Sequence, residues 1–240
     1  MTKPLRQHKK VLLIIWGKNN IDPNFSLKSI LVSGCFFYFY TLLLRAMLEK
    51  LQNYITQNQL FTADDKLLLA VSGGIDSIVM LDLISKLHNK IAILHCNFSL
   101  RGIESDEDEK FVKELAATYG IPIFTKTFDT MKCARENNIS IQMAARDLRY
   151  NWFEEMRQKE NYDHILIAHN KNDLVETFFV NLTRGTGIKG LTGIKVKNKT
   201  TIRPLLFASR NDITEYSIQN KLKYREDSSN AQTKYKRNKI

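Results

Sequence analysis

Short apolar runs alternate with amphipathic stretches along most of the chain from Met47 onward. The apolar runs are continuous and bounded by turn residues, which is typical of buried strands of a parallel sheet: residues 67–71, 91–95, 122–127 and 163–168. The stretches that follow them carry apolar residues at helical spacing, at residues 76–88, 104–120, 140–158 and 172–184. A short strand near 201–203 and a helix over about 210–220 complete the pattern.

This order of elements predicts the class of fold. Strands and helices alternate, and each connection between strands is long enough to cross over a sheet. The pattern therefore predicts an α/β protein, with a Rossmann-like parallel sheet covered by helices on both faces. In such sheets ligands bind at the carboxyl ends of the strands. Any chemistry is expected in the loops that follow residues 71, 95 and 168.

Residues 1–46 do not follow this pattern. Their apolar run at 30–44 has no charged residue, but it is shorter than the roughly 20 residues that a membrane-spanning helix needs. Three interpretations are open: an upstream extension with the working protein starting at Met47, a membrane-associating segment, or a helix packed on the domain. The first is favoured, because a helix-like pattern begins at Met47. The predicted organisation is an atypical extension (1–46), a catalytic domain (47–220) and a basic segment (221–240).

Charge and cysteine content narrow the functional classes. The formal net charge is +11, and residues 189–240 carry 13 lysines and arginines against 4 acidic residues. A basic C-terminal end suits a polyanion such as RNA, although it is equally compatible with a solubilising surface. Three scattered cysteines form no disulfide framework and no paired metal motif, which suits a reducing cytoplasm. A cytoplasmic protein without a membrane partner is expected.

The most specific motif is Ser72-Gly73-Gly74-Ile75-Asp76-Ser77, directly after the first strand. Two glycines let a backbone approach a ligand closely, and a helix N-terminus offers free N–H groups and a positive dipole. The loop therefore predicts an anion site, most simply for phosphate, with Asp76 as a candidate Mg²⁺ ligand. It is not a Walker A loop. The alternative is a plain turn with Asp76 as a helix cap.

The loop resembles the pyrophosphate-binding loop of the N-type ATP pyrophosphatase (PP-loop) superfamily, whose members cleave ATP between its α and β phosphates. Longer motifs are similar to one branch, the tRNA(Ile)-lysidine synthetases. The motifs are HCNFSLRGIESDEDEKFV at 95–112, AARDLRYNWF at 144–153, IAHNKNDLVETFFVNLTRGTGIKGLTGI at 167–194, IRPLL at 202–206, EDSSN at 226–230 and YKRN at 235–238. The resemblance covers residues 65–238.

This resemblance implies a reaction and a set of site residues. ATP, with Mg²⁺, would adenylate the C2 oxygen of the wobble cytidine of a CAU-anticodon tRNA(Ile). Free lysine would then displace AMP. A homodimer is left open. The residues expected to bind nucleotide are Ser72, Gly73, Gly74, Ile75, Asp76, Ser77, His95, Arg101, Arg146, His169, Arg184 and Gly185. The residues expected to carry the chemistry are Asp76, Asp173, Glu176 and Arg203, with Asp76 as the metal ligand.

Asp173 and Glu176 are expected to recognise lysine, because residues three apart share one helix face. The alternative is that they cap the helix and match its dipole. His95 has an equal claim to a structural role, and the glycines after Arg184 fit a simple turn. The acidic run 104–109 is expected to be a dipole-matched first turn, and Tyr150 and Phe153 to be core residues.

The sequence departs from the family pattern in two places. Asn170 and Asn172 stand where the family often has histidine and aspartate. The chain also ends at Ile240, where the family continues into a tRNA-binding region, so a truncated chain is expected. Two other functions stay open beside the ligase. One is a tRNA thiolase of the same superfamily, which the lack of paired cysteines disfavours. The other is a remnant that binds nucleotide or RNA without catalysis.

Overall fold

The structure is a computed structural model that describes residues 47–185 and 193–225. Within these residues six strands form one sheet, in the order β3-β2-β1-β4-β6-β5. The strands are β1 (Leu67–Ala70), β2 (Ile91–Asn97), β3 (Ile123–Thr127), β4 (His164–Ile167), β5 (Lys197–Asn198) and β6 (Thr201–Ile202). Neighbouring strands are parallel, except that β5 and β6 are antiparallel.

The helices follow the sequence pattern closely. They are α3 (Ile75–Leu87), α4 (Ile103–Tyr119), α5 (Thr130–Glu136), α6 (Ile141–Lys159), α7 (Lys171–Thr183) and α9 (Arg210–Gln219), and residues 47–57 are also helical. Two short elements were not predicted, α5 and β5. α5 has only seven residues, and its clearest signal is the Asp129 side chain, which accepts a hydrogen bond from the Lys132 N–H at 2.9 Å.

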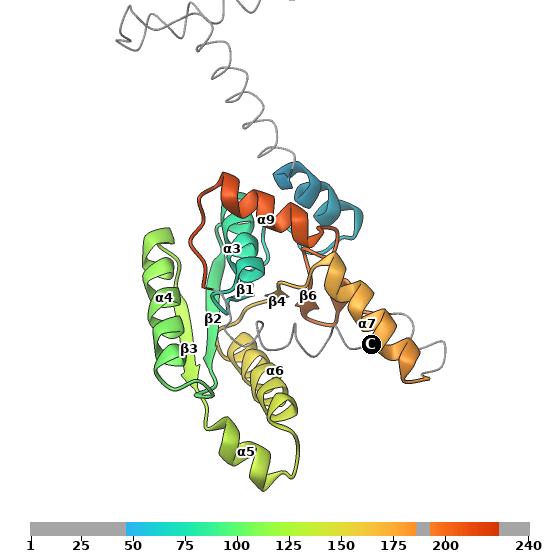
Figure 1. Ribbon diagram of the computed structural model, residues 1–240. Helices are drawn as coiled ribbons and strands as arrows, with labels where there is room; N and C mark the ends of the chain where they lie inside the picture. Colours follow the sequence, from blue (N-terminus) through green and yellow to red (C-terminus); the bar gives the residue numbers. More distant parts are fainter. Residues whose placement is uncertain (1–46, 186–192, 226–240) are drawn as a thin grey trace, which may run out of the picture. The chain divides into compact units, whose positions relative to one another are not determined.

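The central strands β1 and β2 bury side chains on both faces of the sheet. Leu67 and Leu69 point into one core, which α3, α9 and the helix at 47–57 cover, whereas Leu68 points into a second core with Trp152 and Phe153 of α6. Figure 1 shows α3 and α9 side by side near the central strands, with α6 apart from them. Burial on both faces explains why the strands are nearly continuous apolar runs.

β1 is the switch point of the sheet. The chain passes from β1 to β2 and β3 on one side, and then returns to place β4 on the other side of β1. The loops after β1 and β4 therefore meet at the carboxyl edge, where ligands of such sheets bind. The predicted α/β fold is confirmed, with the antiparallel β5–β6 pair as an addition.

Three predicted features lie outside the described part of the chain. They are the N-terminal extension (1–46), the glycine-rich part of the fourth-strand motif (186–192) and the motifs EDSSN and YKRN (226–240). In the described part, none of the helices combines the length and the apolar character that crossing a membrane would require.

Candidate active site

The loop Ser72–Ser77 joins β1 to α3 and is held by its own hydroxyl groups. The Ser77 hydroxyl donates to the Gly74 carbonyl at 2.8 Å and accepts from the Ser72 N–H at 3.2 Å. Gly74 is the N-cap of α3, and no side chain caps this end of the helix. The first N–H groups of α3 therefore lack a side-chain acceptor, and an anion is a suitable partner for them.

Gly73 has a structural reason to be glycine. Its φ is +95°, and a Cβ atom placed there would lie 3.6 Å from the side chains of Phe111 and Val112. Its carbonyl also accepts a hydrogen bond from the Arg225 N–H at 3.0 Å. The loop is thus held between α4 and the segment that follows α9, and Gly73 itself is buried at this contact, where a larger residue would strain the backbone.

Asp76 lies where α3, α7 and α9 begin. Its carboxylate accepts from the Asn170 amide at 3.2 Å and forms an ion pair with Arg210. Burial raises the pKa of the Asp76 carboxyl, while the Arg210 guanidinium and the Asn170 amide oppose that shift. Asp76 therefore does not act as the helix cap that the sequence left open. Its carboxylate faces the N-termini of α7 and α9.

Asn170 and Arg210 are functional candidates that the sequence interpretation missed. Asn170 is fully buried, and its side-chain oxygen accepts from the N–H groups of Asn172 and Asp173 at 2.8 and 3.1 Å. The Arg210 N–H donates to the Asn172 side chain, which ties the start of α9 to the start of α7. The available signal was that Asn170 is a good N-cap residue, directly after the fourth strand.

Asp173 completes a capping box with Asn170, because its carboxylate accepts from the Asn170 N–H at 2.9 Å. The capping role that the sequence left open is therefore present for Asp173. Glu176 lies one turn further along α7 and is exposed. The role of both carboxylates in lysine recognition stays a prediction.

His95 lies in β2, and its ring contacts the backbone that follows β1. The Nδ1 atom of His95 is 2.8 Å from the Val71 carbonyl, so Nδ1 is the protonated nitrogen and Nε2 is an acceptor. Nε2 is buried and has no partner in the described part of the chain. Burial is the main cause that lowers the pKa of His95. The site thus offers one hydrogen-bond acceptor to a donor from a ligand or from water.

His169 and Arg203 are brought together as a pair. Arg203 is buried, and its Nε–H donates to Nδ1 of His169 at 3.2 Å, while Nη1 donates to the Lys195 carbonyl. Burial lowers the pKa of His169, and the Arg203 charge adds to this effect. The Asp173 charge opposes it, and Arg146 and Arg149 make smaller contributions that lower the pKa. The neutral ring therefore prevails, and Arg203 keeps a fixed positive charge near the ends of β4 and β6.

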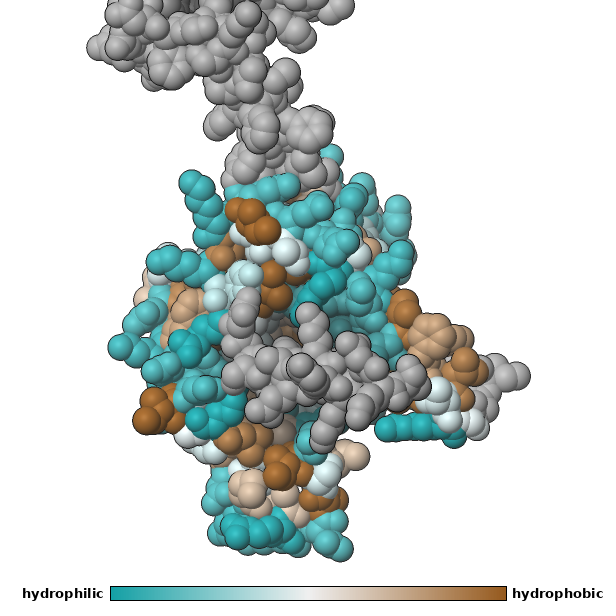
Figure 2. All heavy atoms as spheres, viewed as in Figure 1, coloured by the Kyte–Doolittle hydropathy of each residue, from teal (hydrophilic) through white to brown (hydrophobic). Residues whose placement is uncertain are grey.

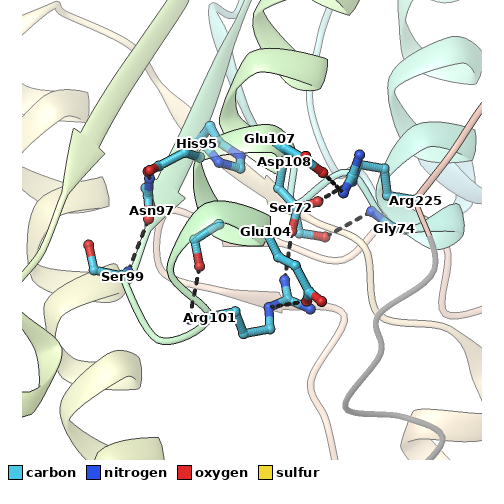
Figure 3. Close-up of polar contacts among 12 residues, drawn as sticks. Ser72, Gly74, His95, Asn97, Ser99, Arg101, Glu104, Glu107, Asp108 and Arg225 are labelled. Atoms are coloured by element: carbon cyan, nitrogen blue, oxygen red, sulfur yellow. Dashed lines mark hydrogen bonds and ion pairs between the residues drawn. The ribbon is translucent and has the colours of Figure 1, made fainter.

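Arg101 lies in an ion-pair cluster at the start of α4. Asp108 pairs with Arg101 at 2.6 Å on one side and with Arg225 on the other, and Arg225 also pairs with Glu107 at 2.9 Å. Figure 3 shows this cluster beside Ser72 and Gly74. The acidic run 104–109 is therefore more than a dipole-matched first turn, because Glu107 and Asp108 pair with arginines at the edge of the Ser72–Ser77 loop.

The other residues predicted to bind nucleotide do not belong to the hydrogen-bonded groups around the Ser72–Ser77 loop. Arg146 is exposed and its guanidinium lies 5.0 Å from the ring centroid of Tyr150, and Arg149 lies 5.1 Å from that of Phe98. Arg184 and Gly185 follow the last turn of α7, at the opposite end from Asn170. At 1.5 Å per residue, α7 separates them from Asn170 by about 20 Å. Phe153 is buried in the core as expected, and Tyr150 is half-buried.

This arrangement defines the chain as an α/β domain with a glycine-rich loop and an uncapped helix N-terminus at the switch point of its sheet. It belongs to the family described as "PP-loop domain", whose profile matches residues 44–240. It is 45% identical over 192 residues to a tRNA(Ile)-lysidine synthase of Bacteroides thetaiotaomicron, covering 80% of this chain and 45% of the relative. It is 42% identical over 199 residues to the enzyme of the same name from Clostridium perfringens, covering 81% of this chain and 42% of the relative. The chain spans less than half the length of these relatives.

Solved structures support the fold. The U34-tRNA thiolase NcsA of Methanococcus maripaludis superposes with a TM-score of 0.64 at 20% identity, covering 78% of this chain and 66% of that chain. The NH3-dependent NAD synthetase of Campylobacter jejuni gives a TM-score of 0.51 at 15% identity, with 76% and 74% covered. At these identities the likeness concerns the architecture alone.

Proposed function

We propose that this chain is an ATP-dependent tRNA-modifying ligase that joins lysine to C2 of the wobble cytidine in a CAU-anticodon tRNA(Ile). The observation that carries the proposal is the open N-terminus of α3 behind the Ser72–Ser77 loop, in a chain 45% identical to a tRNA(Ile)-lysidine synthase over 192 residues. The basic end of the chain suits RNA phosphates. We further propose that the chain acts in the cytoplasm as a homodimer.

The reaction has two steps, and each needs a different part of the site. In the first, the cytidine C2 oxygen attacks the α-phosphorus of ATP and pyrophosphate leaves. The backbone N–H groups of the loop and the Ser72 and Ser77 hydroxyls would bind the departing pyrophosphate. In the second, the lysine ε-amine attacks C2 and the C2–O bond to AMP breaks. The amine loses a proton, for which Glu176 is the proposed acceptor, directly or through water.

A Mg²⁺ ion fits the donors at this place. The described part of the chain gathers no group of three or more histidine, cysteine or acidic side chains suited to a metal. Asp76 is the carboxylate that belongs to the loop itself, whereas Glu107 and Asp108 at its edge pair with arginines. Mg²⁺ commonly takes one or two carboxylates and completes its shell with phosphate oxygens and water. Asp76 would hold the ion, which neutralises phosphate charge when it is bound.

Lysine recognition is assigned to the start of α7. Glu176 is exposed on the turn after the capping box, whereas Asp173 uses one carboxylate oxygen for the cap. Glu176→Gln should therefore raise KM for lysine far more than KM for ATP. The matched control is Glu136→Gln, an exposed glutamate on α5. An unaltered lysine KM in folded Glu176→Gln enzyme would remove Glu176 from the lysine site.

The function is tested with labelled ATP, lysine and a tRNA(Ile) transcript that carries the CAU anticodon. The proposal expects AMP release that depends on both lysine and the tRNA, and a gain in tRNA mass equal to lysine minus water. A transcript with uridine in place of the wobble cytidine is the control. AMP release that requires a sulfur donor would indicate a thiolase. Nucleotide or RNA binding without AMP release would indicate a non-catalytic remnant.

A further inference from the structure

Arg210 engages the carboxylate that we propose as the Mg²⁺ ligand. Its Nη1 group forms an ion pair with Oδ2 of Asp76. The other carboxylate oxygen, Oδ1, accepts a hydrogen bond from the Asn170 amide at 3.2 Å. A cation that approaches Asp76 therefore meets a carboxylate whose two oxygens already have partners within the chain, and one of these partners is itself a cation.

The two partners of Asp76 differ in how firmly they are held. Asn170 is fully buried, and its side-chain oxygen caps α7 by accepting from the N–H groups of Asn172 and Asp173 at 2.8 and 3.1 Å. Moving this amide away from Asp76 would also break the cap. The Arg210 side chain is 49% exposed, so its guanidinium can turn into solvent. Arg210 is therefore the partner that leaves Asp76 at the lower cost.

Arg210 stays near the loop when its side chain moves. Its backbone N–H donates to the Asn172 side chain at 3.0 Å, which fixes the first residue of α9 beside the start of α7. The surface where Figure 1 places the start of α9 is mainly hydrophilic in Figure 2, so a displaced guanidinium remains in polar surroundings. A fixed backbone with an exposed side chain suits a group that exchanges one anionic partner for another.

The charges at this place favour such an exchange. A divalent cation about 4 Å from a guanidinium is repelled enough to lower its affinity by about tenfold or more, even in bulk water. Metal binding at Asp76 therefore drives Arg210 away from the carboxylate. The phosphates of ATP bring several negatively charged oxygens to the same place, and the arginine fork is well suited to pair with them.

We infer that Arg210 is a placeholder cation for Asp76, which pairs with the carboxylate before ATP binds and then transfers to a phosphate oxygen when Mg²⁺ takes its place. The inference rests on the proposed function, because it takes ATP and Mg²⁺ as the ligands. It gives Arg210 two successive partners at one site. The ion pair also keeps Asp76 from presenting an uncompensated negative charge to the incoming phosphates.

Metal binding to the full chain without nucleotide tests the first half of the inference. Mn²⁺ is the probe in place of Mg²⁺, and electron paramagnetic resonance measures the free ion. Arg210→Gln removes the positive charge, so this variant should bind Mn²⁺ about tenfold more tightly than the parent chain. The gain should be lost in the Arg210→Gln/Asp76→Asn double variant, which would assign the metal to Asp76.

Nucleotide binding tests the second half. The probe is α,β-methylene ATP with Mg²⁺, which cannot be cleaved between its α and β phosphates, and calorimetric titration measures its dissociation constant. Arg210→Gln should weaken this binding about tenfold, the effect of losing one charge-assisted hydrogen bond to a phosphate. Arg210→Lys keeps the charge but not the fork, so it should bind Mn²⁺ like the parent chain and lose about threefold in nucleotide affinity.

The two affinities should change in opposite directions, which separates the exchange from a structural role. If Arg210 only held α9 in place, Arg210→Gln would weaken the binding of both Mn²⁺ and the nucleotide. The matched control is Arg135→Gln, which removes one positive charge from an exposed position on α5. This control should keep both affinities of the parent chain.

An Mn²⁺ affinity of folded Arg210→Gln that equals that of the parent chain overturns the placeholder role, as does a gain that persists in the double variant. An unaltered nucleotide affinity overturns the transfer to phosphate. The proposed reaction is judged separately, by AMP release from the parent chain with lysine and tRNA. A parent chain that releases no AMP while the two affinities still change in opposite directions would refute the ligase and leave the exchange standing.

Discussion

Two strand–loop–helix units lie side by side in the sheet, and they use their helices differently. β1 leads into α3, which buries eight of its residues, whereas the neighbouring β4 leads into α7, which buries none. α3 is further fixed by Asp82, whose carboxylate accepts hydrogen bonds from Tyr119, Tyr216 and Lys86. The unit that carries the phosphate loop is thus the more rigidly packed of the two.

The two helix starts differ in a complementary way. α7 satisfies its first N–H groups with the side chains of Asn170 and Asp173, whereas α3 begins at Gly74 with no side-chain cap. The capped helix then supplies its Asn170 amide to Asp76 on the uncapped one. The N-terminus of α7 is thus closed by its own side chains, whereas the N-terminus of α3, for which we propose a phosphate ligand, has no side-chain cap.

The largest expected effect on activity comes from removing the polar groups at the N-terminus of α3. Ser72→Ala combined with Asp76→Asn should lower ATP-to-AMP turnover by at least about 10²–10³, the effect of losing one positioned donor to a transition state. Thermal unfolding and circular dichroism should show an intact fold. Turnover equal to that of the parent would refute the assignment of this loop.

Removing Asn170, the N-cap of α7, should lower the free energy of unfolding. Asn170→Ala deprives two helix N–H groups and Asp76 of a fully buried partner, so the free energy of unfolding should fall by about 2 kcal/mol. Denaturant titration measures this change. Asn170→Ser keeps a good N-cap and should recover about half of the loss. A stable Asn170→Ala variant would contradict the supporting role of α7.

Giving α3 an asparagine N-cap like that of α7 should weaken ATP binding while it changes stability little. Gly74 has an extended backbone with φ −74°, and a Cβ atom there meets only the Ser72 hydroxyl at 3.6 Å. Gly74→Asn should raise stability by only a few tenths of a kcal/mol. It should weaken ATP binding about tenfold, because the new side chain competes for the open N–H groups.

Calorimetric titration with ATP checks the binding loss. Ser140→Asn is the matched control, since Ser140 is the N-cap of α6 and has the same extended backbone as Gly74, with φ −66°. If Gly74→Asn binds ATP as tightly as the control, the open end of α3 does not hold the phosphates.

The smallest effect concerns pH and the histidine that supports β1. Burial lowers the pKa of His95 in the folded chain, so the unfolded chain binds a proton first as the pH falls below about 6.5. Stability should therefore decline with acidification until the pH passes the folded pKa, by at most about 1.4 kcal/mol per pH unit. His95→Gln should remove this part of the slope in unfolding measurements between pH 7.5 and 5.5. An unchanged slope would show that His95 contributes nothing to it.

The order of strands and helices can be predicted from the sequence, because buried parallel strands and amphipathic helices space their apolar residues differently. The phosphate loop was readable for a similar reason, since Gly73 must adopt a positive φ and the motif is contiguous. The short elements α5 and β5 were not predicted, because seven and two residues carry too little periodicity. The sequence leaves Asp173 open as a lysine ligand or a helix cap, and the structure shows that its carboxylate accepts a hydrogen bond from the Asn170 N–H.

The amino-acid pattern is enough to predict the fold class, the place of the Ser72–Ser77 loop and the resemblance to PP-loop enzymes. The residues that lie around Asp76 follow from the packing of distant segments. Arg210 stands 134 residues away from Asp76 in the chain, and Arg225 reaches Asp108 across a similar separation. Such pairs depend on how α9 packs beside α3. Local periodicity reports which face of a helix is buried, but it holds no information on the neighbour that buries it.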